Sequence, residues 1–233
     1  MRMRTTILTG MLMAAWAAGS RGQELFTDEN RFYLAPIVGT SWATLVDEEY
    51  QPLVNGNLFT AGGAGGMAFA RTNGQVRLEF EGRYRDQFSI DRQGATPLGL
   101  ASADLQVTDN WSAMVNGWRD FSITDKLGIY GGGGIGAGGY GLNFNAGLTG
   151  QPPLLYARDR HTEFAWQVGA GVLYALHERI TLDLGYRFYQ VGLGRTTVTG
   201  PLAEFVKLDP VDTGLACNEM LLTLRIYDPF RRW

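Results

Sequence analysis

The stretch from Gln75 to Arg85 constrains the fold more than any other part of the sequence. Its residues alternate between an uncharged set and a charged set. The uncharged set is Val76, Leu78, Phe80, Gly82 and Tyr84, and the charged set is Arg77, Glu79, Glu81, Arg83 and Arg85. A period of two predicts a β-strand, because successive side chains of a strand point to opposite faces.

The charged face of this strand excludes an apolar surrounding on that side, since buried charge without a partner is too costly. Two arrangements remain. Either one face lies in water, or the apolar face meets lipid while the charges line a polar, charge-paired lumen. The rest of the chain distinguishes between them.

The N-terminus has the features of a secretory signal peptide. Arg2 and Arg4 precede an apolar run over residues 7–18, and small residues follow. A retained transmembrane anchor is the alternative, but the run is shorter than the ~18–20 residues that a membrane-spanning helix needs. We therefore predict removal of residues 1–22, export, and one domain over residues 23–233.

Composition excludes several classes of function. The net charge is −3 and no basic block is present, so nucleic acid is not an expected partner. Cys217 is the only cysteine, so no disulfide can form within the chain. With two histidines and no cysteine cluster, we expect neither a metal site nor a cofactor.

The alternating pattern and turn residues predict eight strands joined by connectors of two kinds. The expected strands cover residues 32–42, 58–71, 75–90, 105–121, 126–144, 162–176, 179–192 and 218–227. Short connectors at 72–74, 122–125 and 177–178 alternate with long ones at 43–57, 91–104, 145–161 and 193–217. All long connectors therefore fall at one end of the sheet.

One-sided loops, an even strand number and strands of ~10 residues or more are typical of bacterial outer-membrane barrels. We predict an all-β, eight-stranded, antiparallel up-and-down transmembrane β-barrel. It has short periplasmic turns and four long extracellular loops. Aromatic residues near strand ends predict lipid-facing girdles. These residues are Phe80, Tyr84, Phe164, Trp166, Tyr174, Tyr186 and Phe188.

Glycine is concentrated in the expected strand at residues 126–144. Overall, 32 of the 233 residues are glycine, about twice the average share of 7%. In a small closed barrel, glycines leave room for large lumen side chains from neighbouring strands. A phosphate-binding loop is the weaker reading, because no helix and no Lys-Ser/Thr pair follow.

The charged faces of three expected strands predict a salt-bridged plug. An eight-stranded barrel is just wide enough to be filled by side chains, and buried charges must be nearly balanced. The predicted lumen network is Arg77, Glu79, Glu81, Arg83, Arg85, Asp183, Arg187, Glu219 and Arg225. Such a plug makes a diffusion porin an unlikely reading.

Four segments of the chain resemble the opacity-type, OmpA-like outer-membrane β-barrel family. They are WSAMVNGWRDF at 111–121, LGIYGGGGIG at 127–136, FAWQVGAGV at 164–172 and LDLGYRF at 182–188. The resemblance implies an eight-stranded barrel in a bacterial outer membrane, without an enzymatic site common to the family. Such barrels usually end on an aromatic that the barrel assembly machinery reads. Tyr227 and Trp233 both remain candidates here, because Asp228 and Pro229 interrupt the last strand.

Three functions follow as alternatives. The leading one is a structural, surface-interaction (adhesin-like) protein, a monomer that contacts outer-membrane lipid. Its loops then bind a surface or matrix ligand or simply pack over the barrel mouth. The loop residues concerned are Tyr50, Leu53, Leu98, Leu100, Leu154, Leu155, Tyr156, Phe205 and Val206. The second is a soluble lipocalin-like binding barrel, and the third a lipid-A-modifying enzyme that uses His161.

Overall fold

The computed structural model describes residues 25–26, 29–97 and 99–231. The expected signal peptide at 1–22, Leu98 and Trp233 lie outside the described residues, as does the side chain of Val206. Among the described residues, no helix is long and apolar enough to cross a membrane.

Nearly all of the described chain is β-strand. The strands are β1 (Arg31–Val46), β2 (Pro52–Arg71), β3 (Gly74–Arg85), β4 (Phe88–Thr96), β5 (Gly99–Ser122), β6 (Leu127–Leu148), β7 (Leu155–His177), β8 (Ile180–Thr196) and β9 (Val211–Tyr227). One short helix, α2 (Pro201–Val206), lies between β8 and β9.

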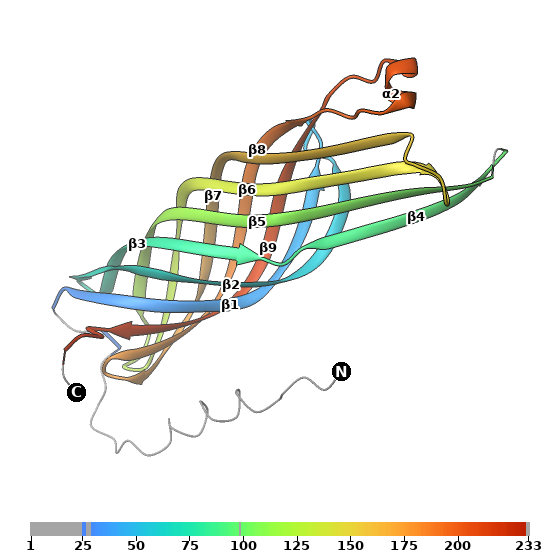
Figure 1. Cartoon of the computed structure of the whole chain (residues 1–233). Coiled ribbons are helices and arrows are strands. Elements are labelled where there is room, and N and C mark those ends of the chain that lie inside the picture. Colours follow the sequence, from blue (N-terminus) through green and yellow to red (C-terminus); the bar gives the residue numbers. More distant parts are fainter. Residues whose placement is uncertain (1–24, 27–28, 98, 232–233) are drawn as a thin grey trace, which may run out of the picture.

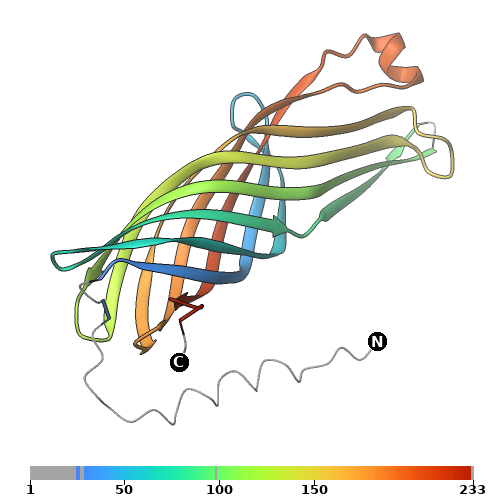
Figure 2. The same cartoon turned by 60° about the vertical axis from the view of Figure 1, so that its left-hand side comes forward.

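The strands form a closed antiparallel ring (Figures 1 and 2). The pairing runs β3-β2-β1-β9-β8-β7-β6-β5, and β3 pairs with β5 to close it. β4 pairs with β5 beyond the end of β3, so β3 and β4 share one position in the ring. The predicted eight-position up-and-down barrel is confirmed. The expected strand at 75–90 is interrupted at Asp86 and Gln87.

Short connections gather at one end, here called the turn end. Residues 72–73, 123–126 and 178–179 join strands there, beside the start of β1 and the end of β9. The predicted hairpin is present: Arg71 pairs with Gly74, so that Thr72 and Asn73 form the loop. Asn73 has φ 63° and Gly74 has φ 141°, and positive φ is a conformation that favours asparagine and glycine.

At the opposite end, here called the loop end, the strands run further than predicted. The connections shrink to residues 47–51 and 149–154 and to the segment 197–210 that contains α2, while β4 and β5 form a long hairpin. Part of the segments predicted as long loops does alternate, as Ala101, Ala103 and Leu105 do with Ser102 and Asp104, although both faces are partly exposed there. Their backbones continue the ladder, as in the β5–β6 register from Ala101↔Leu148 to Thr108↔Gly141.

Glycine positions allow bulky residues to lie inside the ring, as the sequence predicts. A Cβ on Gly132 of β6 would lie 2.8 Å from the Trp118 ring of β5. A Cβ on Gly185 of β8 would collide with the Tyr130 hydroxyl. Trp118 and Tyr130 are both buried and meet edge to face, with ring centroids 5.6 Å apart. Small residues on one strand therefore make space for aromatic residues on the next.

Candidate functional site: the charged interior and the loop end

β3 separates the two environments of the barrel wall. Its exposure pattern alternates along the whole strand, with the charged residues buried and the apolar ones exposed. Phe80 is 62% exposed, whereas Glu81 beside it is fully buried. This arrangement is the reverse of a soluble lipocalin-type barrel, which needs an apolar interior and a polar exterior. The structure therefore speaks against that alternative.

The nine residues of the predicted lumen network all lie inside the ring, each at most 4% exposed. Toward the turn end, Asp120 of β5 accepts hydrogen bonds from two arginines. Arg77 Nε lies 2.9 Å from Asp120 Oδ2, and Arg225 Nη1 lies 3.1 Å from the same oxygen. Arg77 also pairs with Glu79 at 3.1 Å, and Arg225 with Asp183.

A second set of ion pairs follows toward the loop end. Arg83 Nε donates to Glu81 Oε1 at 2.5 Å, and Arg85 Nε donates to Glu219 Oε1 at 2.7 Å. Arg83 also reaches Glu219, and Arg187 reaches Glu81. Each of these two carboxylates thus pairs with two arginines, which offsets the cost of burying it.

Neutral side chains join the two sets. Asn116 Nδ2 donates to Glu79 Oε1 at 3.1 Å and to Glu81 Oε2 at 3.0 Å. Trp118 Nε1 donates to Glu79 Oε1 at 2.7 Å, and Gln167 Nε2 donates to the side-chain oxygen Oδ1 of Asn116 at 2.7 Å. The interior at this level is therefore one connected polar network, which spans strands on opposite sides of the ring.

Aromatic rings cover the arginine planes. The guanidinium of Arg187 lies 4.7 Å from the Trp118 ring centroid, and that of Arg85 lies 4.0 Å from the Tyr189 centroid. Cation–π contacts of this kind are strongest away from water. They also fill the lumen between the ion pairs, so that the charged layer is packed as well as paired.

Asp120 is the network residue that sequence reasoning missed. With it, the buried network holds five arginines and five carboxylates, where the predicted set had only four carboxylates. The parity of β5 carries the signal: Asn116, Trp118 and Asp120 share one face, and Val115 and Phe121 share the other. Arg119 next to Asp120 obscured the alternation, because its charged side chain lies on the outward face.

Above the charged layer, the interior becomes apolar. Val107, Met114, Leu142, Val191 and Leu215 are buried in one cluster that includes residues of most strands. Cys217, the only cysteine of the sequence, is fully buried in this cluster. The buried side chains inside the ring thus form a charged layer and, toward the loop end, a mainly apolar one.

The predicted girdle residues lie on the outside of the ring. Phe80, Tyr84, Phe164, Trp166, Tyr174 and Tyr186 are exposed, and Phe188 is half-buried. Phe188 packs on Trp166, with ring centroids 5.4 Å apart. An apolar outer wall with aromatic residues suits an acyl-chain environment bordered by headgroups.

His161 lies within β7 and faces the interior at 8% exposure, instead of ending a loop as expected. Its Nε2 lies 3.0 Å from Thr196 Oγ1, and its ring packs against Tyr140. Among the described residues, no group of three or more potential metal ligands is found. This position suits a buried polar contact between strands β7 and β8.

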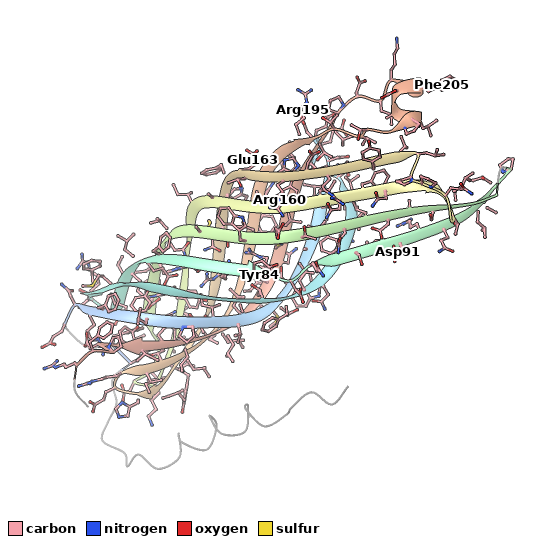
Figure 3. The ribbon with its side chains drawn as sticks, viewed as in Figure 1. Tyr84, Asp91, Arg160, Glu163, Arg195 and Phe205 are labelled. Carbon is pink, nitrogen blue, oxygen red and sulfur yellow. The ribbon has the colours of Figure 1, made fainter. Side chains whose placement is uncertain are left out.

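The loop end carries exposed charge and exposed apolar side chains (Figure 3). Arg160 and Asp109 form an exposed ion pair at 3.1 Å. In the β4–β5 hairpin, Asp104 lies opposite Asp91. Partial desolvation, followed by the hydrogen bond and charge of Asp91, raises the pKa of Asp104. Phe205 of α2 is 87% exposed.

The last strand, β9, ends at the turn end of the barrel. Tyr227 faces inward, where its hydroxyl accepts a hydrogen bond from Gln75 at 2.8 Å. Phe230, beyond the strand, is exposed and stacks on Phe32 with a centroid separation of 6.3 Å. Of the two candidate terminal signals, Tyr227 is therefore oriented toward the lumen, and Trp233 lies outside the described residues.

Three solved structures that are similar to this chain have little sequence in common with it. Neisserial surface protein A is 17% identical; the match covers 84% of this chain and 96% of that one, with a TM-score of 0.41. Ail of Yersinia pestis is also 17% identical, covers 82% and 98%, and has a TM-score of 0.36. The protease OmpT of Escherichia coli is 9% identical, covers 87% and 98%, and has a TM-score of 0.49.

No curated protein sequence matches this chain. The model of the outer membrane protein β-barrel domain matches residues 5–201. That match includes most of the ring described above, with its apolar wall and its turns and loops at opposite ends. The chain therefore belongs to the outer membrane protein β-barrel domain family and is a protein of the bacterial outer membrane.

Proposed function

We propose that this protein is an adhesin-like surface-interaction protein of the opacity-type, OmpA-like group, anchored by a barrel with a charge-plugged lumen. The observation that carries the proposal is the projection of strands beyond the girdle, which supports exposed apolar side chains at the loop end. These include Tyr50, Leu53, Leu100, Leu154, Tyr156 and Phe205. Exposed aromatic residues on rigid elements are favourable anchors for a protein partner.

The filled interior supports a binding role over transport. The charged layer and the apolar cluster above it occupy the lumen between β3 and the strands opposite. A pore through this interior would separate ion pairs such as Arg77–Asp120, which would leave buried charge unpaired. The partner is therefore expected at the outer rim of the barrel.

A lipid-modifying enzyme is the less favoured reading. His161 would have to act as a base, but its ring is buried against Tyr140 and its Nε2 contacts Thr196. Lipid A analysis of cells that express the His161→Ala variant tests it. Under our proposal, wild type and variant give the same lipid A profile as cells without the protein.

We also propose two further partners, outer-membrane lipid and the barrel assembly machinery, and a monomeric state. The aromatic wall contacts outer-membrane lipid, and the barrel assembly machinery reads the C-terminal strand. We expect a monomer, because the ring of strands closes on itself through the β3–β5 pairing and needs no second copy.

Adhesion of whole cells to immobilised matrix proteins and to epithelial cells tests the proposal. Cells that display the wild-type protein should adhere more than cells without it. The triple variant Tyr50→Ser, Tyr156→Ser and Phe205→Ser should lose about tenfold or more of that binding, because exposed aromatic anchors carry much of an interface's energy. Ile123→Ser at the turn end, also exposed, is the matched control and should adhere normally. Equal adhesion with and without the protein would contradict the proposal.

A further inference from the structure

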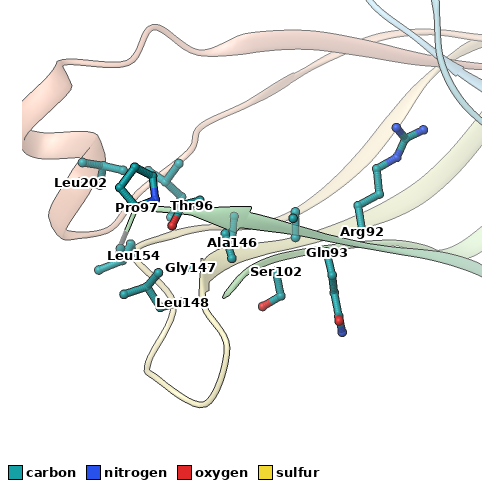
Figure 4. Close-up of a pocket in the computed structure, with 14 residues that line it drawn as sticks. Arg92, Gln93, Thr96, Pro97, Ser102, Ala146, Gly147, Leu148, Leu154 and Leu202 are labelled. Carbon is teal, nitrogen blue, oxygen red and sulfur yellow. The ribbon is translucent and has the colours of Figure 1, made fainter. Parts of the chain in front are cut away.

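A groove of about 630 Å³ lies at the loop end, between the β4–β5 hairpin, the β6–β7 connection and α2 (Figure 4). Its size falls within the range of about 300–1,000 Å³ that is usual for small-molecule sites. The α2 segment is tied to the groove's rim: Leu202 N donates to the Leu154 carbonyl at 3.1 Å. Leu202 and Leu154 both line the groove.

The floor of the groove is a row of directly opposed residues across four strands, with Arg92 at its edge and small or apolar residues beyond it. Arg92 of β4 lies opposite Ala103 of β5, which lies opposite Ala146 of β6, and Ala146 lies opposite Leu155 of β7. Side chains at directly opposed positions share one face of a sheet. The groove therefore continues the lumen-facing side of the barrel wall above the membrane.

The rows closer to the membrane extend this surface downward. Ile90, Leu105 and Phe144 are cross-strand neighbours, and Leu105 and Phe144 pack against the apolar interior cluster. That cluster is buried. The apolar face that forms the groove floor thus continues along the same strands toward the buried interior.

Arg92 gives the groove its single charge. It is the one charged residue among the described residues that line it, and within the described chain it has no ion-pair partner. An arginine at the rim of a groove whose other lining residues are uncharged and mostly apolar favours a ligand with an anionic group at one end.

The strand ladder is interrupted beside the groove. β2 pairs with β3 only from Thr60↔Arg85 onward, and β4 pairs with β5 alone, so residues 52–59 of β2 have ladder partners only on β1. The junction between β3 and β4 still contacts this stretch of β2: Asp86 N donates to the Phe59 carbonyl at 2.9 Å, and the Phe88 ring lies against Gly56.

We propose that the groove binds a single-chain anionic amphiphile of the fatty-acid class. The chain lies along the row of Ala101, Ala103, Ala146 and Leu148, and the carboxylate pairs with Arg92. The adhesion test does not affect this inference, since Tyr50, Tyr156 and Phe205 do not line the groove; Leu154 is the one residue named for both.

Photo-crosslinking tests the inference on the full-length protein in lipid nanodiscs. The probe is a palmitate analogue with a diazirine near its methyl end, and labelled peptides are mapped by mass spectrometry. Labelling of the girdle near Phe164 reports contact with bulk lipid and serves as the internal reference. Labelling of peptides around Ala101–Ala103 and Ala146–Leu148, competed by unlabelled palmitate, is expected.

Two variants separate occupancy from charge recognition. Ala146→Trp fills the groove and should abolish its labelling, whereas Ala95→Trp on the opposite face of β4 should not. Arg92→Gln should lower groove labelling about threefold to fivefold at subsaturating probe, as expected for a partly exposed ion pair, with no effect on the uncharged methyl ester. Labelling confined to the girdle would overturn the proposal, as would groove labelling that survives Ala146→Trp. Equal labelling by acid and ester would overturn the carboxylate assignment.

Discussion

The two halves of the barrel interior solve the problem of filling a narrow lumen in different ways. Toward the turn end, five arginines and five carboxylates pair across the ring, and neutral amides and aromatic rings complete the packing. Toward the loop end, the buried side chains form an apolar cluster, and the groove lies beyond it. The charged half is tightly constrained, because each ion depends on its partners, whereas the apolar half tolerates an opening.

This difference predicts the largest effect for the removal of one network carboxylate. Asp120→Ala leaves Arg77 and Arg225 without their shared acceptor, which should lower the free energy of unfolding by about 3–5 kcal/mol. Urea unfolding of the protein in lipid, followed by heat-modifiable migration on gels, measures it. Asp212→Ala at the exposed loop end is the control and should change stability by less than about 1 kcal/mol. An unfolding midpoint for Asp120→Ala equal to that of wild type would show that the network does not stabilise the barrel.

A smaller effect is predicted for a methyl group added inside the ring. Gly132→Ala places a Cβ against the Trp118 ring and the neighbouring backbone, and should cost about 1–3 kcal/mol through overpacking. Gly117 of the adjacent strand has open space around its Cβ position. Gly117→Ala should therefore leave the unfolding midpoint unchanged or raise it slightly, and the opposite ranking of the two variants would refute this account of the packing.

The exposed ion pair at the loop end should matter much less than the buried ones. Arg160→Ala removes its contact with Asp109, where both side chains are largely exposed, and should change the free energy of unfolding by at most about 1 kcal/mol. The same urea series measures it, with salt titration as a check. If Arg160→Ala lowered the free energy of unfolding as much as Asp120→Ala does, burial of an ion pair would not determine its contribution to stability.

The smallest effect concerns pH at the β4–β5 hairpin. Because the pKa of Asp104 is raised in the folded protein, the folded state binds more protons than the unfolded state just above the usual pKa of an aspartate. The hairpin should therefore become more protected as pH falls into that window and less protected as pH rises out of it. Hydrogen exchange of the hairpin amides measures this, and Asp91→Asn should weaken the trend, because it removes the charge of Asp91 but not the desolvation of Asp104. Protection that increases with pH would contradict the assigned direction.

The sequence was sufficient to predict the architecture, because the alternation at 75–85 and the one-sided distribution of connectors are direct consequences of a closed sheet in lipid. The sequence did not identify Asp120 as a member of the network, because the charged Arg119 beside it interrupts the apparent alternation of β5. It also failed to predict how far the strands extend. The Gly, Pro, Asp and Asn residues of those segments favoured loops, although Ala101, Ala103 and Leu105 alternate there with Ser102 and Asp104. The groove depends on that extension of the strands.

The central claim is that paired charges and packed side chains close the lumen. Single-channel recording of the purified wild-type protein in planar lipid bilayers tests it most directly. The account predicts no stable channel. A sustained, ohmic open conductance of the wild-type protein would contradict it.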